Sequence, residues 1–326
     1  MNKESNRMQD NITRYSEKDI DNILINALGE KYSEYRNLWN NSSYTNIPKF
    51  PVHIDFELND FCNQSCIMCP RNSKKHPDIN YTFNSKDKFE FQTFKQIIDE
   101  GVLEGLQSIN LGAFAEPLLN ENTFKMIKYA SSKGIVDTRL ITNGLLLEKN
   151  IDNIFESKLV NLFVSIDAYS EEQYFKIRGN GFERVKNSLE KLLKERTLRG
   201  SVLPIIRVSF VDMDTNKHEK EQFIEYWKKK VDFIDIQVFD DYNVDIKKEF
   251  DFSKKKKWDC YSPFARLAIL SNGNILPCCN FFGRNIPIGN IHKSSIKQIW
   301  NSKKINDIRD GIVNDTNRNC SICQRI

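Results

Sequence analysis

From Pro51 onwards the sequence alternates between strand-like and helix-like segments, and this alternation limits the folds open to the chain. Apolar residues at helical spacing, such as Phe94, Ile97 and Ile98, separate the strand-like runs. Each helical crossover returns the chain to the same edge of a sheet, so consecutive strands must run parallel. Six strands are expected, at 54–58, 108–112, 138–142, 162–166, 205–211 and 233–238. The pattern predicts an α/β sheet or barrel with too few units for a closed eight-stranded barrel.

Charge and hydropathy exclude several classes of partner. Lys and Arg total 48 and Asp and Glu total 44, a net charge of +4 that is too balanced to indicate nucleic acid or a membrane surface. Residues 1–19 lack the apolar core of a signal sequence, and no later stretch is long and apolar enough to span a membrane. We therefore expect a cytoplasmic protein. In that compartment the eight cysteines indicate metal or redox ligands rather than disulfides.

The strand-like runs divide the chain into three parts. Residues 1–50 are expected to form a helical N-terminal extension, with one helix over 17–39 and Ser16 as its N-cap. The α/β domain is placed at 51–245. A small C-terminal domain is placed at 246–326, because the four-lysine run at 254–257 is typical of a solvated linker.

Three cysteines, Cys62, Cys66 and Cys69, lie within eight residues directly after the first predicted strand. A zinc or iron site built only from protein takes four ligands, so a compact trio leaves one position for something else. An iron-sulfur cluster with one open iron fits this number. Spacing alone also permits zinc completed by a distant histidine, or three buried small residues.

The spacing Cys62-x3-Cys66-x2-Cys69 resembles the signature of radical SAM enzymes. The resemblance implies a 4Fe-4S cluster that binds S-adenosylmethionine (SAM) through its amino and carboxylate groups and cleaves it reductively to a 5′-deoxyadenosyl radical. It implies an open (β/α)6 partial TIM barrel, with the active site at the C-terminal strand ends. It also implies a flavodoxin- or ferredoxin-type electron donor as a partner.

Residues at successive strand ends resemble further parts of that family's pattern. Glu116 lies in a segment similar to the Gly-Gly-Glu-Pro region that contacts the SAM amino group, with Ala115 where glycine is usual. The resemblance places Asn143 and Ser165 on the ribose side and Arg178 on the carboxylate, which a guanidinium fork suits. The ordinary alternatives are a surface acid for Glu116, a generic turn for Asn143 and a solvated helix-end cation for Arg178.

A second set of cysteines lies near the C-terminus. Residues 271–278 are expected to form a hairpin leading into a thiol site, for which spacing alone also permits zinc. The arrangement resembles the SPASM/twitch extension of radical SAM enzymes. The shorter twitch form, a β-hairpin plus helix around one auxiliary 4Fe-4S cluster, is expected because a full SPASM domain needs more cysteines. Its implied ligands are Cys260, Cys278, Cys320 and Cys323.

One cysteine is left over from both sets. Cys279 directly follows an implied ligand, and it is interpreted as a buried small residue, an alternative ligand or a hydrogen-atom donor.

The two cysteine sets together resemble radical SAM dehydrogenases that oxidise a secondary alcohol of an aminocyclitol. The resemblance implies a radical SAM oxidoreductase that takes hydrogen from a small carbohydrate-like or aminocyclitol-like alcohol and oxidises it to a ketone. Other readings stay open: an epimerase of a sugar-like substrate, a peptide maturase acting on a ribosomal precursor, and a cluster-binding scaffold without turnover. The short N-terminal region argues against the maturase, because a fused leader-recognition domain would need more residues.

Overall fold

The computed structural model describes residues 12–72, 86–239, 260–314, 316, 317 and 320. The predicted boundary at 245/246, the four-lysine run and Cys323 lie outside these residues. Within the described residues one sheet contains ten strands, in the order β1-β7-β6-β5-β4-β3-β2-β8-β9-β10. The sheet does not close on itself, and the prediction of an open α/β barrel is confirmed.

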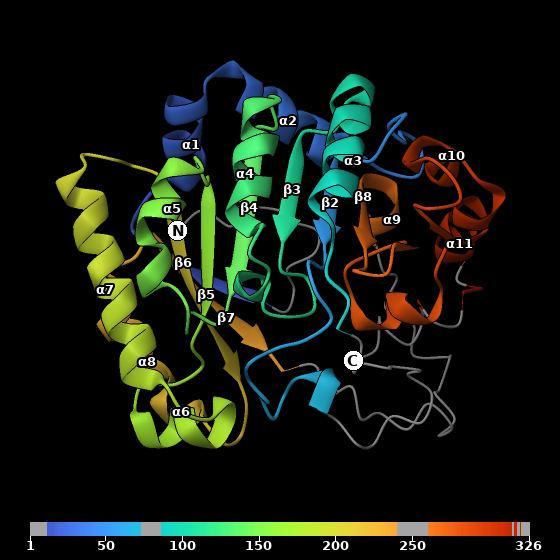
Figure 1. The fold of residues 1–326 in the computed structure, drawn as a ribbon. Helices are drawn as coiled ribbons and strands as arrows, with labels where there is room; N and C mark the ends of the chain where they lie inside the picture. The colour runs from blue at the N-terminus through green and yellow to red at the C-terminus, as the bar shows by residue number, and fades with distance from the viewer. Residues whose placement is uncertain (1–11, 73–85, 240–259, 315, 318–319, 321–326) are drawn as a thin grey trace.

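All six predicted strands form, and each is parallel to its neighbours among them. They are β2 (His53–Phe56), β3 (Ser108–Leu111), β4 (Asp137–Thr142), β5 (Asn161–Ser165), β6 (Ile205–Asp212) and β7 (Phe233–Val238). Helices cover the outer face of this sheet (Figure 1). They are α3 (Phe91–Glu104), α4 (Thr123–Ser132), α5 (Ile151–Glu156), α6 (Glu171–Arg178), α7 (Phe182–Leu198) and α8 (Lys220–Trp227). Short 3-10 turns lie at Pro70–Asn72, Pro117–Leu119, Glu148–Asn150, Lys217–Glu219 and Phe281–Asn285.

The two faces of the parallel strands differ in polarity. On β2, Ile54 and Phe56 are fully buried in the core between the sheet and the helices. Side chains alternate between the faces of a strand, so His53, Asp55 and Glu57 point to the inner face. We call this inner face the lumen. On the other parallel strands it comprises Ser108, Asn110, Asp137, Arg139, Ile141, Asn161, Phe163, Ser165, Ile205, Arg207, Ser209, Val211, Phe233, Asp235 and Gln237.

The N-terminal region differs from the single helix predicted over 17–39. A strand, β1 (Ile12–Tyr15), pairs antiparallel with β7 at one edge of the sheet. Two helices follow, α1 (Ile20–Leu28) and α2 (Glu30–Asn41), with Gly29 between them at a φ of 76° that glycine adopts readily. Asp19 caps α1 by accepting a hydrogen bond from the Asn22 backbone N–H. Ser16, the predicted cap, instead donates to the Asp232 carbonyl.

Helices α1 and α2 close the N-terminal end of the barrel. Their buried side chains Leu24, Tyr32 and Tyr35 form one cluster with residues from the first half of the strands, including Ile205 and Phe233. The strands point away from these two helices (Figure 1). The cysteine loop after β2 therefore lies at the opposite, C-terminal end of the sheet, as the sequence predicts.

The C-terminal region extends the same sheet. The predicted hairpin forms from β8 (Arg266–Ile269) and β9 (Asn274–Leu276), with β10 (Gly289–Asn290) antiparallel to β9. β8 also pairs in parallel with β2, which the sequence did not predict. The helices of this region are α9 (Ser262–Ala265), α10 (Ile296–Trp300) and α11 (Lys303–Val313). Because β8 adjoins β2, the segment with Cys278 and Cys279 is anchored beside the strand that leads into the cysteine loop.

Across the described part of the chain, no helix is long and apolar enough to cross a membrane.

Candidate active site

The cysteine loop is fastened to the strand ends by backbone and side-chain hydrogen bonds. The Ile67 N–H donates to the Ile177 carbonyl at the end of α6, at 3.0 Å. Asn143, directly after β4, donates from Nδ2 to Asn63 Oδ1 at 2.7 Å. Each of Cys62, Cys66 and Cys69 is half-buried. The loop is thus a fixed platform whose thiols keep some access to the space above the strand ends.

Two polar side chains donate toward the sulfur atoms. Asn143 Nδ2 lies 3.9 Å from Cys62 Sγ, and Arg178 Nη1 lies 3.6 Å from Cys66 Sγ. Burial raises the pKa of Cys66 to about 11, and the Arg178 charge acts in the opposite direction. Donors of this kind compensate the negative charge of a thiolate-bound cluster.

The three thiols fit an iron-sulfur cluster better than a single ion. They are soft ligands on one short loop, with a cation and an amide facing them. No three Cys, His, Asp or Glu side chains gather tightly enough to hold one metal ion within the residues described. In a cluster the thiolates bind different irons, so they need not meet at one point.

Arg178 is held in place by a buried carboxylate that the sequence reasoning did not assign to the site. Its Nε lies 2.7 Å from Asp167 Oδ2, its Nη2 bonds the same oxygen, and its Nη1 lies 3.4 Å from Gln64 Oε1. Burial opposes the charge on Arg178, but Asp167 and Cys66 raise its pKa overall. The arginine is therefore a fixed cation at the cysteine loop rather than a solvated helix end.

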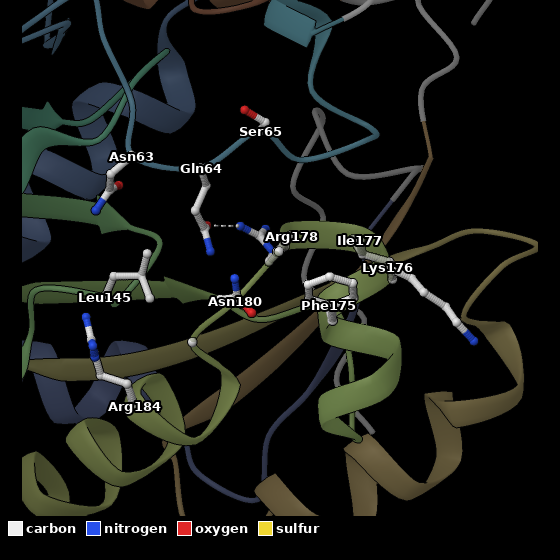
Figure 2. Close-up of a pocket in the computed structure, with 12 residues that line it drawn as sticks. Asn63, Gln64, Ser65, Leu145, Phe175, Lys176, Ile177, Arg178, Asn180 and Arg184 are labelled. Atoms are coloured by element: carbon white, nitrogen blue, oxygen red, sulfur yellow. Dashed lines mark hydrogen bonds between the residues drawn. The ribbon is translucent and has the colours of Figure 1, made fainter.

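A pocket of about 630 Å³ lies between the cysteine loop and the turn that joins α6 to α7. Figure 2 shows Gln64 and Arg178 joined by a hydrogen bond on one side, with Leu145, Asn180 and Arg184 also lining the space. Its volume suits a small-molecule ligand. An apolar side chain, amides and a fixed guanidinium beside the cluster loop fit the adenosyl and carboxylate parts of SAM.

Glu116 joins the ends of β3 and β4. Its Oε1 accepts from Thr142 Oγ1 at 2.8 Å and from the Leu118 N–H at 3.0 Å, and its Oε2 accepts from the Asn143 N–H at 2.8 Å. Burial raises the pKa of Glu116 to about 7, and these three hydrogen bonds oppose the shift. Glu116 therefore positions Asn143, which in turn contacts Cys62 and Asn63.

The structure brings the four predicted SAM residues to one end of the sheet but not to one surface. Arg178 lines the pocket. Asn143 contacts the pocket residue Asn63, and Glu116 supports Asn143. Ser165 ends β5 opposite Ser209 of β6, on the lumen side, and is not among the pocket-lining residues.

Asn63, Gln64, Asp167 and Arg184 belong to this site although sequence reasoning passed over them. Asp167 carried a usable signal, because it is an acidic residue directly after β5 with an arginine a short helix away. Asn63 and Gln64 occupy the variable positions of the cysteine signature, where no residue type is required, so the sequence held no sign of their contacts. Arg184 is one of many arginines in the chain, and only its place beside the pocket marks it.

The C-terminal cysteines lie on both sides of the added hairpin. Burial raises the pKa of Cys320 to about 12, with a contribution from its neighbour Cys260. A Cβ atom on Gly283 would lie 2.8 Å from Cys278 Sγ, so this glycine leaves room around that sulfur. Cys279 instead packs in a separate cluster with Phe114, Ala268 and Phe281, on the lumen side of the sheet. Of the implied ligands, Cys260 and Cys320 thus come from distant segments and lie close enough to interact.

A buried ion pair links the two cysteine regions. Arg284 Nη1, from the C-terminal region, lies 2.6 Å from Glu57 Oε2 at the end of β2. The same guanidinium stacks on Phe114 at 4.8 Å, and Phe114 meets Phe281 edge-on at 5.1 Å. Residues of both cysteine regions therefore form the contact between them.

Family models match both cysteine regions. The model described as the radical SAM superfamily matches residues 56–208, and an iron-sulfur cluster-binding domain of the SPASM type matches residues 260–325. The chain therefore contains a radical SAM domain followed by an iron-sulfur cluster-binding domain of the SPASM type. Its cofactors are accordingly SAM and two 4Fe-4S clusters, as the resemblance to radical SAM enzymes implied.

The chain spans about half the length of the curated relatives it matches. A probable GTP 3′,8-cyclase of Methanococcus vannielii is 28% identical over 52% of this chain and 52% of its own. A GTP 3′,8-cyclase of Synechocystis sp. is 25% identical over 55% of this chain and 52% of its own. These relatives are named cyclases rather than dehydrogenases. They support a radical SAM enzyme, and the oxidation of an alcohol to a ketone stays a prediction.

Solved radical SAM structures share the fold. BtrN in complex with AdoMet and 2-DOIA superposes with a TM-score of 0.54 at 18% identity, covering 84% of this chain and 93% of BtrN. SuiB of Streptococcus suis, bound to the precursor peptide SuiA, gives a TM-score of 0.61 at 14% identity, covering 86% of this chain and 70% of SuiB. One of these proteins is bound to a small molecule and the other to a peptide, so the shared fold does not choose between the two substrate classes.

Proposed function

We propose that this radical SAM enzyme oxidises a carbohydrate-like or aminocyclitol-like alcohol to a ketone. The observation that carries the proposal is the polarity of the lumen. A packed barrel interior is filled mainly by branched apolar side chains. Here the lumen positions of β2, β3 and β4 hold buried polar residues, among them His53, Asp55, Ser108, Asn110 and Asp137. These residues mostly bond to other residues of the protein: Asn110 donates to Asp55 and Asn161 donates to Asp137, each at 2.8 Å, while Asn110 Oδ1 has no partner within the described residues. A polar surface of this kind suits a substrate rich in hydroxyl or amino groups.

The predicted SAM contacts form part of the proposal. Arg178, fixed by Asp167, would hold the SAM carboxylate, and Asn143 and Ser165 would serve the ribose side. Glu116 has accepted two hydrogen bonds on Oε1 and one on Oε2, which leaves one acceptor position on Oε2 for the amino group. The charges of Glu116 and Arg178 match the two charged groups of the SAM methionine part.

Oxidation of a carbinol to a ketone removes one hydrogen atom, one proton and one electron from the substrate. Bound SAM would supply the radical that takes the hydrogen atom, with 5′-deoxyadenosine as its product, and the auxiliary cluster that the C-terminal cysteines would hold would supply the acceptor for the electron. A side chain of the protein must accept the proton, and we assign this role to Glu57. Burial raises the pKa of Glu57 despite its contact with Arg284, which makes it a better base than Asp55, whose pKa Arg266 and His53 lower.

The test is turnover of aminocyclitols and sugars by enzyme reconstituted anaerobically with iron and sulfide, with SAM and a reductant present. The expected result is a ketone, with 5′-deoxyadenosine formed above the level seen without substrate. Deuterium placed at the reacting carbon should appear in 5′-deoxyadenosine. If no alcohol of the panel raises 5′-deoxyadenosine formation, the proposed substrate class is wrong.

Epimerisation is a second candidate because Cys279 packs on the lumen side of β8 and β9, where a thiol could return hydrogen to a substrate radical. Only epimerisation introduces a solvent-derived hydrogen at the reacting carbon. An inverted alcohol that carries deuterium after reaction in D2O would therefore identify an epimerase. If Cys279→Ala still forms a ketone at the normal rate, the epimerase hypothesis is wrong.

A further inference from the structure

Two arginines of the lumen stack on the same aromatic ring. Arg139 of β4 and Arg207 of β6 place their guanidinium carbons 4.9 Å and 4.1 Å from the centre of the Phe163 ring, on the strand between them. Phe163 itself belongs to the cluster that α1 and α2 help to build. Both cations therefore lie against the Phe163 ring at the inner face, and the ring attracts each cation without neutralising its charge.

The carboxylates around these arginines do not balance their charge. Asp235 is shared between Arg14, at 2.9 Å, and Arg207, at 3.2 Å. Asp137 lies 3.3 Å from Arg139 and also accepts hydrogen bonds from Tyr35 and Asn161. Three guanidinium groups thus share two carboxylates, which leaves an excess of one positive charge. The Arg14 and Arg139 side chains are 30% and 28% exposed, so water screens part of this charge, and a negatively charged ligand would complete the balance.

Polar atoms of the same group lack hydrogen-bond partners. The buried Nε atoms of Arg139 and Arg207 and the buried Oδ1 of Asn110 have none within the described residues. Asn110 is 4% exposed and pairs in register with Arg139 on the adjacent strand. Each buried donor or acceptor left unpaired costs free energy, because water no longer solvates it. Two donors from cations and one neighbouring acceptor suit an oxyanion and an adjacent hydroxyl group.

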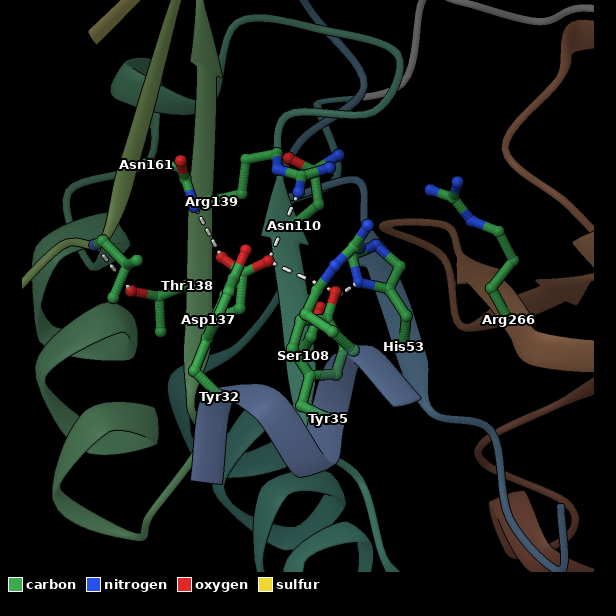
Figure 3. A network of polar contacts seen from close by, with 12 residues as sticks. Tyr32, Tyr35, His53, Ser108, Asn110, Asp137, Thr138, Arg139, Asn161 and Arg266 are labelled. Atoms are coloured by element: carbon green, nitrogen blue, oxygen red, sulfur yellow. Dashed lines mark hydrogen bonds and ion pairs between the residues drawn. The ribbon is translucent and has the colours of Figure 1, made fainter. Parts of the chain in front are cut away.

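The group faces the end of the lumen where substrate would enter. Figure 3 shows Asn110 and Arg139 on the side of Asp137 that is away from Tyr32 and Tyr35 of α2. The Arg139 side chain is 28% exposed, while that of Asp137 is 3% exposed. A ligand in the lumen can therefore reach Arg139 from the C-terminal end of the strands.

We infer that Arg139, Arg207 and Asn110 form a subsite for an oxyanion, a phosphate or carboxylate group carried by the substrate. The inference rests on the proposed function only in that the substrate occupies the lumen. It narrows the substrate class from carbohydrate-like or aminocyclitol-like alcohols in general to those that carry an acidic group.

The test measures anion binding directly, so that it does not depend on turnover. Inorganic phosphate is titrated into the cluster-loaded enzyme with SAM bound, at low ionic strength, and binding is followed by calorimetry. We expect saturable binding that Arg139→Gln and Arg207→Gln each weaken by about tenfold or more, since a charge-assisted hydrogen bond is lost. The control is Arg199→Gln, on the exposed surface of α7, where Arg199 pairs with Asp152. It should leave phosphate binding unchanged.

A purely structural role for these arginines predicts a different pattern. In that case Arg139→Gln would lower the free energy of unfolding and leave phosphate binding intact. A binding role predicts that Arg139→Gln keeps or raises the free energy of unfolding, because one of three crowded cations is removed while Asp137 retains Tyr35 and Asn161. Absence of saturable phosphate binding, or equal affinity in wild type and Arg139→Gln, would overturn the inference.

The source of the oxyanion is tested with matched ligands: a hexose 6-phosphate, a hexuronate and the neutral hexose. Tighter binding of one acidic sugar than of the hexose, lost in Arg139→Gln, identifies the preferred group. Phosphate binding without ketone formation from any alcohol would refute the proposed function and leave the subsite standing. Ketone formation without phosphate binding would refute the subsite and leave the proposed function standing.

Discussion

Glu116→Gln should change how the stability of the protein depends on pH. The wild-type carboxyl is 2% exposed, and burial raises its pKa from 4.5 to about 7. A carboxyl with a raised pKa in the folded state contributes stability below its unfolded pKa, and this contribution is lost as the pH rises through the folded value. The glutamine variant keeps the size and most of the shape of the side chain but cannot titrate.

The magnitude follows from the shift in pKa. Each unit is worth roughly 1.4 kcal/mol, so the full loss on raising the pH is about 3.4 kcal/mol. Between about pH 5 and about pH 8 the loss is about 2.5 kcal/mol, because some of the titration lies outside that interval. Over the same interval, the free energy of unfolding of Glu116→Gln minus that of wild type should therefore increase by about 2.5 kcal/mol.

Urea unfolding of both proteins at the two pH values, under anaerobic conditions and without SAM, measures this difference. Every other titrating group is common to the two proteins, so its contribution cancels. Glu121→Gln is the matched control: Glu121 is an exposed glutamate paired with Lys88, and its replacement should change the pH dependence by less than about 0.5 kcal/mol. A difference between Glu116→Gln and wild type that stays constant with pH would refute the burial argument.

Three further predictions concern the two cysteine regions. Cys66→Ala should abolish SAM cleavage and lower the iron content from about eight to about four atoms per chain. Zinc at the C-terminal cysteines, in place of the remaining four irons, would contradict this prediction. Arg178→Gln should weaken SAM binding about tenfold or more at unchanged iron content, and unchanged affinity would remove Arg178 from the SAM site. Gly283→Ala should reduce only the iron of the C-terminal region, because the added Cβ would lie 2.8 Å from Cys278 Sγ. Full iron content in that variant would show that Cys278 does not bind the cluster.

Much of the barrel was predictable because its signals are local. On β2, polar His53 and Asp55 alternate with apolar Ile54 and Phe56, and this period of two indicates a strand with two different faces. The helices between strands carry apolar residues at helical spacing for the same reason. The cysteine spacing is also local, so the cluster loop and its place after the first parallel strand could be predicted together.

The N-terminal region shows where local signals fail. Helical spacing was present over 17–39, but the chain turns at Gly29, whose positive φ starts a second helix. The strand β1 is four residues long and is stabilised by pairing with β7, more than 200 residues away in the sequence. A short segment has no strong preference of its own, so only its partner decides its structure.

The candidate site shows the same difference between local signals and long-range contacts. The sequence by itself predicted which residues form the site: the cysteines, Glu116, Asn143, Ser165 and the arginine of α6. Only the tertiary structure decided their partners: Asp167 for Arg178, Asn143 for Glu116, and the shared ring of Phe163 for two arginines. It also placed β8 beside β2 and so joined the two cysteine regions. Residue type sets what a side chain can do, but charge balance and burial depend on which distant segments pack around it.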